Sequence, residues 1–282
     1  MIKKLLLIAM VLFCVVTPAQ EKEKQAIMKE ARLLYNSERA SWSGTDIFMA
    51  KFPKKSEKLG GYFSYSEGNN HKCVFVDKEE NPKVLATVVF DDGFVLEASK
   101  TDTLSRQLTP LESELFNMRQ KALAEIKTDT LFKHYKNTSL NIIPIISNNK
   151  KKVYLLTGPS VTGVVVFGND YLIEFDKNNK IKSKKALHKN IIPINYSDNE
   201  DEVSTMHNHL EETGFLPTAT DICTLLLYAQ YTPWQQHYVI SKRYISIWDC
   251  NKEELFVMTT EAWEKIAKDN KERQYKKEKV KE

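Results

Sequence analysis

Residues 163–187, GVVVFGNDYLIEFDKNNKIKSKKAL, contain three short runs of β-branched and aromatic residues separated by turn-forming residues. The first run covers residues 163–168, and the runs at 171–176 and 181–187 flank Lys177-Asn178-Asn179-Lys180. Two such runs joined by a short polar turn are typical of a β-hairpin. The stretch therefore predicts antiparallel strands, and the same patterns extend this interpretation in both directions along the chain.

The rest of the second half continues with short strands and two helices. We expect strands at 141–146, 153–156, 191–194, 203–210, 238–248 and 255–258, and helices at 219–229 and 260–268. In the first half we expect a helix at 21–40, an antiparallel meander at 61–65, 73–76 and 84–90, and a helix at 109–127. Thr109-Pro110-Leu111-Glu112 opens that last helix with a capping box and a proline at its first position. The predicted fold class is α+β, with mixed or antiparallel sheets flanked by helices.

The same patterns predict four regions along the chain. Residues 1–19 form a signal peptide, 20–135 a small α+β unit, 136–268 a second α/β domain, and 269–282 a charged tail that is solvated and frayed. The boundary between the two larger regions is placed at residues 128–138, which are polar and lack a clear period.

The N-terminus has the three parts of a secretory signal peptide. Lys3 and Lys4 precede an apolar run at residues 5–16, and Thr17-Pro18-Ala19 supplies small residues for cleavage near Ala19–Gln20. The apolar run of twelve residues is shorter than the roughly 20 that a membrane-spanning helix needs. We therefore expect a periplasmic or secreted protein without a transmembrane segment after cleavage. Lipid attachment at Cys14 is the alternative.

Charge and cysteine content exclude several classes of function. The formal net charge is +4, and loss of Lys3 and Lys4 with the signal peptide leaves about +2, with lysines and carboxylates interleaved. This is not the concentrated basic surface of a nucleic-acid-binding protein. Cys73, Cys223 and Cys250 remain, so an odd count leaves at least one free thiol, and no C-x-x-C pair supports a redox or cysteine-rich zinc module.

The informative stretch for chemistry is Met206-His207-Asn208-His209, followed by Pro217-Thr218-Ala219-Thr220-Asp221. On a strand, residues two apart point to the same face, so His207 and His209 would project side by side. Asp221 lies at the start of the next helix, where the loop can return it to the end of the strand. Two histidines, one carboxylate and an open position form a typical catalytic zinc site.

Each of these residues also has an interpretation without a metal. The two histidines could lie on an exposed strand face, and Thr218 with Asp221 could form a capping arrangement at the helix start. The two interpretations of Asp221 do not exclude each other. His71 and His134 are isolated, and we expect them at the surface. For His188 we expect a surface position at a strand end, with a role as an extra ligand as the alternative.

The H-x-H strand followed by a short loop and S/T-x-x-D resembles the JAMM motif of MPN-type zinc metallopeptidases. The resemblance covers roughly residues 150–260 and extends to the order of strands and helix around the motif. It implies an MPN-like second domain in which His207, His209 and Asp221 bind zinc. Thr218 would stand where the family has a serine that helps to hold the oxyanion. Residues 168–193 also resemble uncharacterised exported proteins of Bacteroidota type.

Three positions depart from the family's pattern. Leu210 follows the second histidine where the family usually has proline, and the loop to Asp221 is one residue longer. The family's catalytic glutamate corresponds to Ser160, three residues before Gly163. Serine cannot take a proton from zinc-bound water as a carboxylate does. Either Glu174, Glu211 or Glu212 substitutes for the glutamate, or the site binds metal without peptidase turnover, or the likeness is one of fold alone.

The sequence thus leaves three functions open. The first is an exported zinc hydrolase that cleaves an amide or isopeptide bond in a peptide or cell-envelope substrate. The second is a binding or structural module that keeps the same scaffold without turnover. The third is an interaction protein without a metal.

Overall fold

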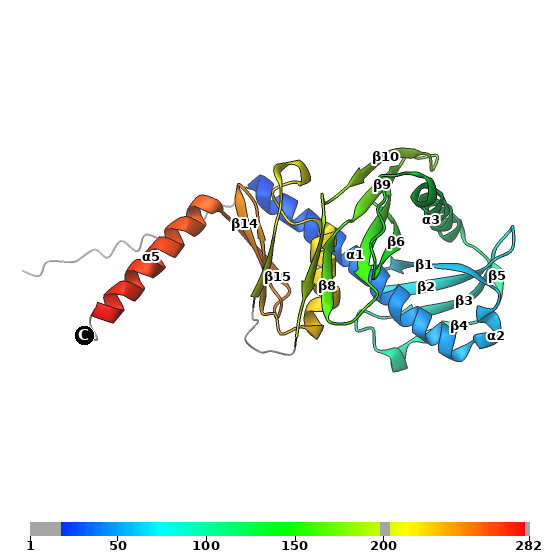
Figure 1. Cartoon of the computed structure of the whole chain (residues 1–282). Helices are drawn as coiled ribbons and strands as arrows, with labels where there is room; N and C mark the ends of the chain where they lie inside the picture. The colour runs from blue at the N-terminus through cyan, green and yellow to red at the C-terminus, as the bar shows by residue number, and fades with distance from the viewer. Residues whose placement is uncertain (1–17, 198–203, 280–282) are drawn as a thin grey trace, which may run out of the picture.

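The computed structural model describes residues 18–197 and 204–279, which form helices packed against several β-sheets (Figure 1). The predicted α+β class is confirmed. Residues 1–17 of the predicted signal peptide lie outside the described residues. None of the described helices is both long and apolar enough to cross a membrane.

The first half folds as the predicted antiparallel meander with flanking helices. Its elements are α1 (Pro18–Lys51), α2 (Pro53–Ser56), β1 (Leu59–Glu67), β2 (Asn70–Asp77), β3 (Lys83–Phe90), β4 (Lys100–Asp102), β5 (Arg106–Gln107) and α3 (Pro110–Thr128). In this sheet β1, β2 and β3 pair in chain order. The capping box of α3 is confirmed, because Thr109 and Glu112 each accept a hydrogen bond from the other's backbone N–H.

The long helix α1 extends well beyond the predicted 21–40. Its last turns bury Ile47 and Phe48, and the Phe48 ring stacks on Phe75 of β2 with centroids 4.1 Å apart. A Cβ at Gly44 would lie 2.6 Å from Cys73 Cβ, so only glycine allows α1 to approach β2 this closely. α1 also contacts α4 and β6, so it packs against both predicted regions (Figure 1).

The second half contains the predicted strands in three further sheets of the described residues. They are β6 (Thr138–Ser147), β7 (Lys150–Pro159), β8 (Val164–Gly168), β9 (Tyr171–Phe175), β10 (Ile181–Ala186), β11 (Ile191–Asn195), β12 (Ser204–Asn208), β13 (Gln236–Ile240), β14 (Tyr244–Asp249) and β15 (Glu254–Thr259). The sheet order is β10-β9-β7-β6, β11 pairs with β8, and β12 leads a sheet in the order β12-β13-β14-β15. The pairing of β12 with β13 is parallel, and α4 (Ala219–Tyr228) lies in the connection between them.

Three expectations from the sequence are wrong in detail. The predicted strand 238–248 is two strands, because Ser241 accepts a hydrogen bond from the backbone of Tyr244 and closes a turn. The last helix, α5 (Thr260–Lys279), includes most of the predicted frayed tail and projects from the body (Figure 1). His71 is buried, with its two ring nitrogens hydrogen-bonded to Ser66 and Asp92, whereas His134 is exposed as predicted.

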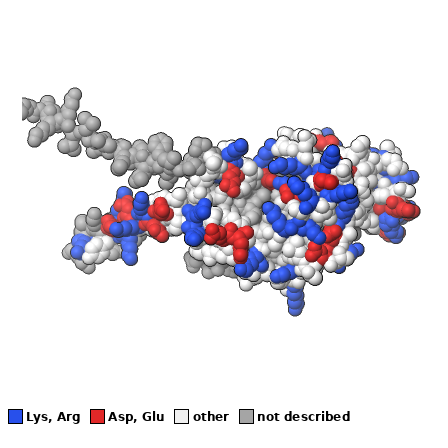
Figure 2. All heavy atoms as spheres, turned by 90° about the horizontal axis from the view of Figure 1, so that it is seen from above, with Lys and Arg blue, Asp and Glu red and all other residues white. Residues whose placement is uncertain are grey.

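Charged side chains of both signs alternate over the face of the body shown in Figure 2. Several of the lysines in strands β7 and β10 are paired with acids of the neighbouring helices. Lys152 lies 2.5 Å from Glu30 of α1, and Lys184 contacts both Glu125 and Asp129 at the end of α3. The charges of these lysines are therefore balanced locally by acidic side chains.

Candidate metal centre

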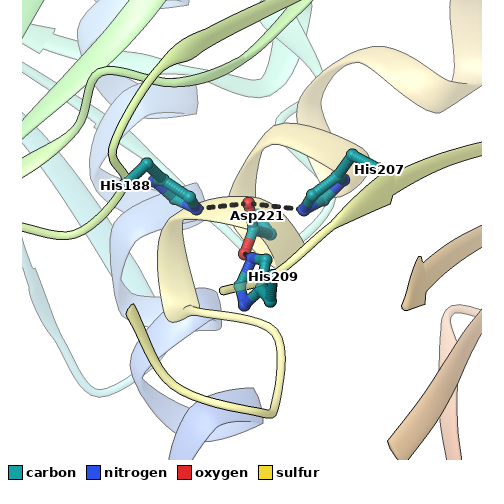
Figure 3. Close-up of side chains that lie close together, drawn as sticks. All are labelled: His188, His207, His209 and Asp221. Atoms are coloured by element: carbon teal, nitrogen blue, oxygen red, sulfur yellow. Dashed lines mark ion pairs between the residues drawn. The ribbon is translucent and has the colours of Figure 1, made fainter. Parts of the chain in front are cut away.

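Four side chains from three segments meet in the second half of the chain (Figure 3). His188 comes from the loop between β10 and β11, His207 from β12, His209 from just beyond β12, and Asp221 from the first turn of α4. One potential ligand atom of each lies within 4.8 Å of those of the other three, and all four residues are buried. The cluster could therefore hold a metal ion.

The separations between the Asp221 carboxylate and the three imidazoles are close to the edge length of a zinc coordination tetrahedron. His188 Nε2 and His207 Nε2 lie 3.0 and 3.5 Å from Asp221 Oδ1, and His209 Nε2 lies 3.2 Å from Asp221 Oδ2. Ligand bonds of 2.0–2.1 Å in tetrahedral geometry place neighbouring ligand atoms about 3.3 Å apart. The imidazole nitrogens thus surround the Asp221 carboxylate, those of His188 and His207 next to Oδ1 and that of His209 next to Oδ2.

The atoms of the cluster that face one another have no hydrogen-bond partner among the described residues. They include Nε2 of all three histidines and Oδ1 of Asp221. Each of these nitrogens lies at ion-pair distance from the Asp221 carboxylate, and a metal ion bound between them would give each nitrogen a ligand bond. The chemistry of the donor set, three imidazoles and a carboxylate, fits a first-row transition metal.

The alternation along β12 explains the position of His207 and His209. Met206 is exposed while His207 is buried, as expected for residues on opposite faces of a strand. The backbone N–H of His209 donates to Ile240 O at 2.8 Å, which prolongs the extended pairing with β13 by one residue. The predicted side-by-side placement of the two histidines is therefore confirmed.

Asp221 is a capping residue and a candidate ligand at once. Its Oδ2 accepts hydrogen bonds from the backbone N–H of Thr218 at 2.7 Å and from the Thr218 hydroxyl at 2.8 Å. These bonds fix the carboxylate and leave Oδ1 directed at His188 and His207. The capping interpretation of Asp221 is confirmed, and its interpretation as a metal ligand stays a prediction.

The expected surface position of His188 is wrong, because the imidazole is buried inside the cluster. Gly168 and the β8–β11 pairing shape the loop that carries it: a Cβ at Gly168, whose φ is +80°, would lie 2.2 Å from Asn190 O. On its far side His188 Nδ1 lies 3.5 Å from Asp170 Oδ2, and the other oxygen of Asp170 accepts the Thr157 N–H at 2.8 Å. Asp170 thus lies behind the His188 ring at ion-pair distance, on the side away from Asp221.

A further buried histidine, His237 on β13, contacts His207 on the side away from Asp221. His237 Nε2 and His207 Nδ1 are 2.8 Å apart, and His237 Nδ1 is 2.7 Å from the Thr205 hydroxyl. If His207 donates from Nδ1 and His237 donates to Thr205, the lone pair of His207 Nε2 is free for a metal. His237 was not predicted from the sequence, although its place two residues before the apolar Val239 on a strand is typical of an inward side chain.

The electrostatics of the cluster follow from burial and from Asp221. Burial alone would raise the pKa of Asp221, but the facing imidazoles of His188, His209 and His207 hold it well below its usual range. Burial opposes protonation of His188, yet Asp221 and Asp170 outweigh it and raise the pKa of His188 to about 9. Burial lowers the pKa of His207 to about 4. A metal that binds at neutral pH would thus displace a proton from His188.

Replacement of His237 tests its supporting role. We expect His237→Phe to weaken metal affinity about 10- to 100-fold, because His207 Nδ1–H loses its acceptor and the ring its fixed orientation. The phenyl ring keeps the stacking surface against Phe167, whose ring lies 4.6 Å from that of His237. Competition with a chelating dye measures the affinity.

His71→Phe is the matched control, since His71 is also a buried histidine with two hydrogen bonds but lies in the first sheet. Equal affinities of the two variants would contradict the role of His237.

Of the three residues predicted to be catalytic, Thr218 contacts the cluster, whereas Glu211 and Glu212 are exposed. Thr218 contacts Asp221 directly, as described above. Glu211 and Glu212 lie on a short 3-10 turn (Glu211–Thr213) and are exposed, and their ion pairs are with Lys242 at 3.9 Å and Lys189 at 2.8 Å. A catalytic role for these three residues stays a prediction.

The other two positions considered for the general base lie elsewhere. Glu174 on β9 accepts a hydrogen bond from Ser183 of β10 at 2.8 Å. Ser160 follows β7 and is exposed.

Comparisons with known proteins give this chain no relative. No protein family, no curated protein and no solved structure matches it, so the MPN-like likeness stays a prediction and the interpretation of the site depends on its own geometry.

Proposed function

We propose that this protein is a zinc-binding protein that encloses the ion with His188, His207, His209 and Asp221, and that the ion stabilises the fold without turning over a substrate. The observation that carries the proposal is the buried position of His188 next to Asp221. Its Nε2 lies 3.0 Å from Asp221 Oδ1 and supplies a fourth protein ligand beside the two histidines and the aspartate of the sequence motif.

The donor set favours zinc over the other common biological cations. Ca²⁺ and Mg²⁺ prefer six or more oxygen ligands, whereas three of the four donors here are imidazole nitrogens. Separations of 3.0–3.5 Å suit the tetrahedron that zinc adopts in structural sites.

A closed set of four ligands argues against hydrolysis. A catalytic zinc site keeps one position for water, and a nearby base must take a proton from that water. Here His188 takes the position that the water would need. The exposed Glu211 and Glu212 are paired with lysines, and Asp170 lies on the opposite side of the His188 ring from Asp221. The second function left open by the sequence therefore has the better support.

Cobalt substitution tests both the metal and the closed set. We expect the purified mature protein to bind one zinc or Co²⁺ per chain, and the Co²⁺ form to have the intense visible absorption of a four-coordinate tetrahedral site. In His188→Ala a water should replace the imidazole, with weaker metal binding and a shifted, less intense spectrum. His134→Ala, which removes an exposed histidine, is the control and should leave the spectrum unchanged.

Two results would contradict the proposal. Failure to reach one metal ion per chain after loading would show that the cluster is not a metal site. A wild-type spectrum identical to that of His188→Ala would show that His188 is not a ligand, and would revive the hydrolase with its open position.

A further inference from the structure

A second candidate site lies on another side of α1 and is independent of the metal. A cavity of about 860 Å³ opens where α1, β1 and α3 of the first half face β6, the β7–β8 connection and the end of α4. Drug-sized ligands bind in cavities of about 300–1,000 Å³, and such cavities are common where two structural units meet. The volume is sufficient for a molecule of the size of a short peptide.

Arg119 of α3 brings a positive charge to this cavity. Its guanidinium lies over the Tyr62 ring, 5.7 Å from the centroid. Among residues 18–197 and 204–279 no carboxylate forms an ion pair with it. Burial lowers the pKa of Arg119, which reflects the cost of holding a cation away from water. An anionic group of a ligand would offset this cost.

Glu38 of α1 lines the same cavity without neutralising Arg119. Its Oε2 accepts a hydrogen bond from Asn141 Nδ2 at 2.8 Å, and burial raises the pKa of Glu38 to about 7. Tyr62 lies within electrostatic range of both charges, since Glu38 raises and Arg119 lowers its pKa, although burial has the largest effect. The cavity thus offers one anion-binding group and, apart from it, a carboxyl–amide pair that can bond to an amide or hydroxyl.

Three aromatic residues stand together at the cavity. The Trp42 ring lies 6.2 Å from that of Tyr228 and 6.5 Å from that of Tyr231. Trp42 and Tyr231 remain 42 % and 51 % exposed, although aromatic side chains of this size stabilise a protein or a complex most when they are buried. They provide apolar surface that a ligand entering the cavity would cover.

We propose that this cavity binds a peptide-like carboxylate, with the carboxylate on Arg119 and an apolar or aromatic side chain against Trp42, Tyr228 and Tyr231. One guanidinium matches the single charge of a carboxylate and can bind it through two parallel hydrogen bonds. Glu38 and Asn141 supply the acceptor and donor that a peptide bond requires. This site does not depend on the proposed zinc function.

A matched pair of ligands tests the proposal. The probes are N-acetyl-phenylalanyl-alanine with a free carboxylate and the same dipeptide as its C-terminal amide, titrated calorimetrically into the purified protein. We expect the wild type to bind the acid about tenfold or more tighter than the amide. Arg119→Met should abolish this preference by weakening only the acid, whereas Trp42→Ala should weaken both ligands.

Two further variants keep the test decisive. Arg119→Lys keeps the charge and should retain part of the preference for the acid. It therefore tests the role of the charge even if Arg119→Met does not fold. Arg273→Met removes an exposed arginine of α5 and should change nothing. Equal binding of acid and amide by the wild type, a preference that persists in Arg119→Met, or no binding of either probe at about 1 mM would each overturn the proposal.

Discussion

Asp221→Asn is expected to lower zinc affinity about 100-fold. Structural zinc in small domains binds with about 10–16 kcal/mol, so one of four ligands accounts for roughly 3 kcal/mol, or about two powers of ten. An amide lacks the charge that balances the ion, although it is the same size as the carboxylate and can still accept hydrogen bonds from Thr218. Competition with a chelating dye and the metal content after dialysis measure the loss.

Glu112→Gln is the control for this substitution. Glu112 has the same position in the capping box of α3 that Asp221 has in α4, and the change of carboxylate to amide is the same. It should cost stability, because Arg106 binds Glu112 through two hydrogen bonds of 2.6 and 2.7 Å, but it should leave one zinc per chain. If Asp221→Asn loses stability as Glu112→Gln does and still retains zinc, Asp221 is a capping residue alone.

Removal of zinc is expected to destabilise the second half of the chain. Free zinc at 100 times its dissociation constant adds about 2.7 kcal/mol to the free energy of unfolding. In a chain of this size that corresponds to a fall of about 5–10 °C in the melting temperature when a chelator is added. Calorimetry measures the melting temperature. Added Mg²⁺ should not restore the original melting temperature, because the donors are mainly nitrogen.

Hydrogen exchange locates this effect within the chain. The ion would join the β10–β11 loop, β12 and the first turn of α4, so the amides of these segments should exchange faster after chelation. Those of β1–β3 in the first sheet serve as the internal reference. An equal chelator-induced shift in Asp221→Asn would show that the chelator acts elsewhere.

The local patterns of the sequence determined most elements and indicated three of the four residues of the metal centre, His207, His209 and Asp221. The apolar runs and Asn-rich turns predicted the hairpins, because side-chain alternation and turn geometry are local properties. His207 and His209 were predicted on one face for the same reason, and Thr218 with Asp221 formed the expected cap. The end of α1 was missed because its contacts with β2 lie far along the chain.

Tertiary structure alone decided the remaining features. His188 looked like a surface residue, since nothing near it in the sequence indicates that the β8–β11 pairing places it opposite Asp221. The support of His207 by His237 likewise depends on the parallel pairing of β12 with β13 across 30 residues. The cavity of Arg119 exists only where α1 and α3 face β6. Ligand sets and cavities are made by contacts between distant segments, whereas sequence periodicity reports only which way each segment faces.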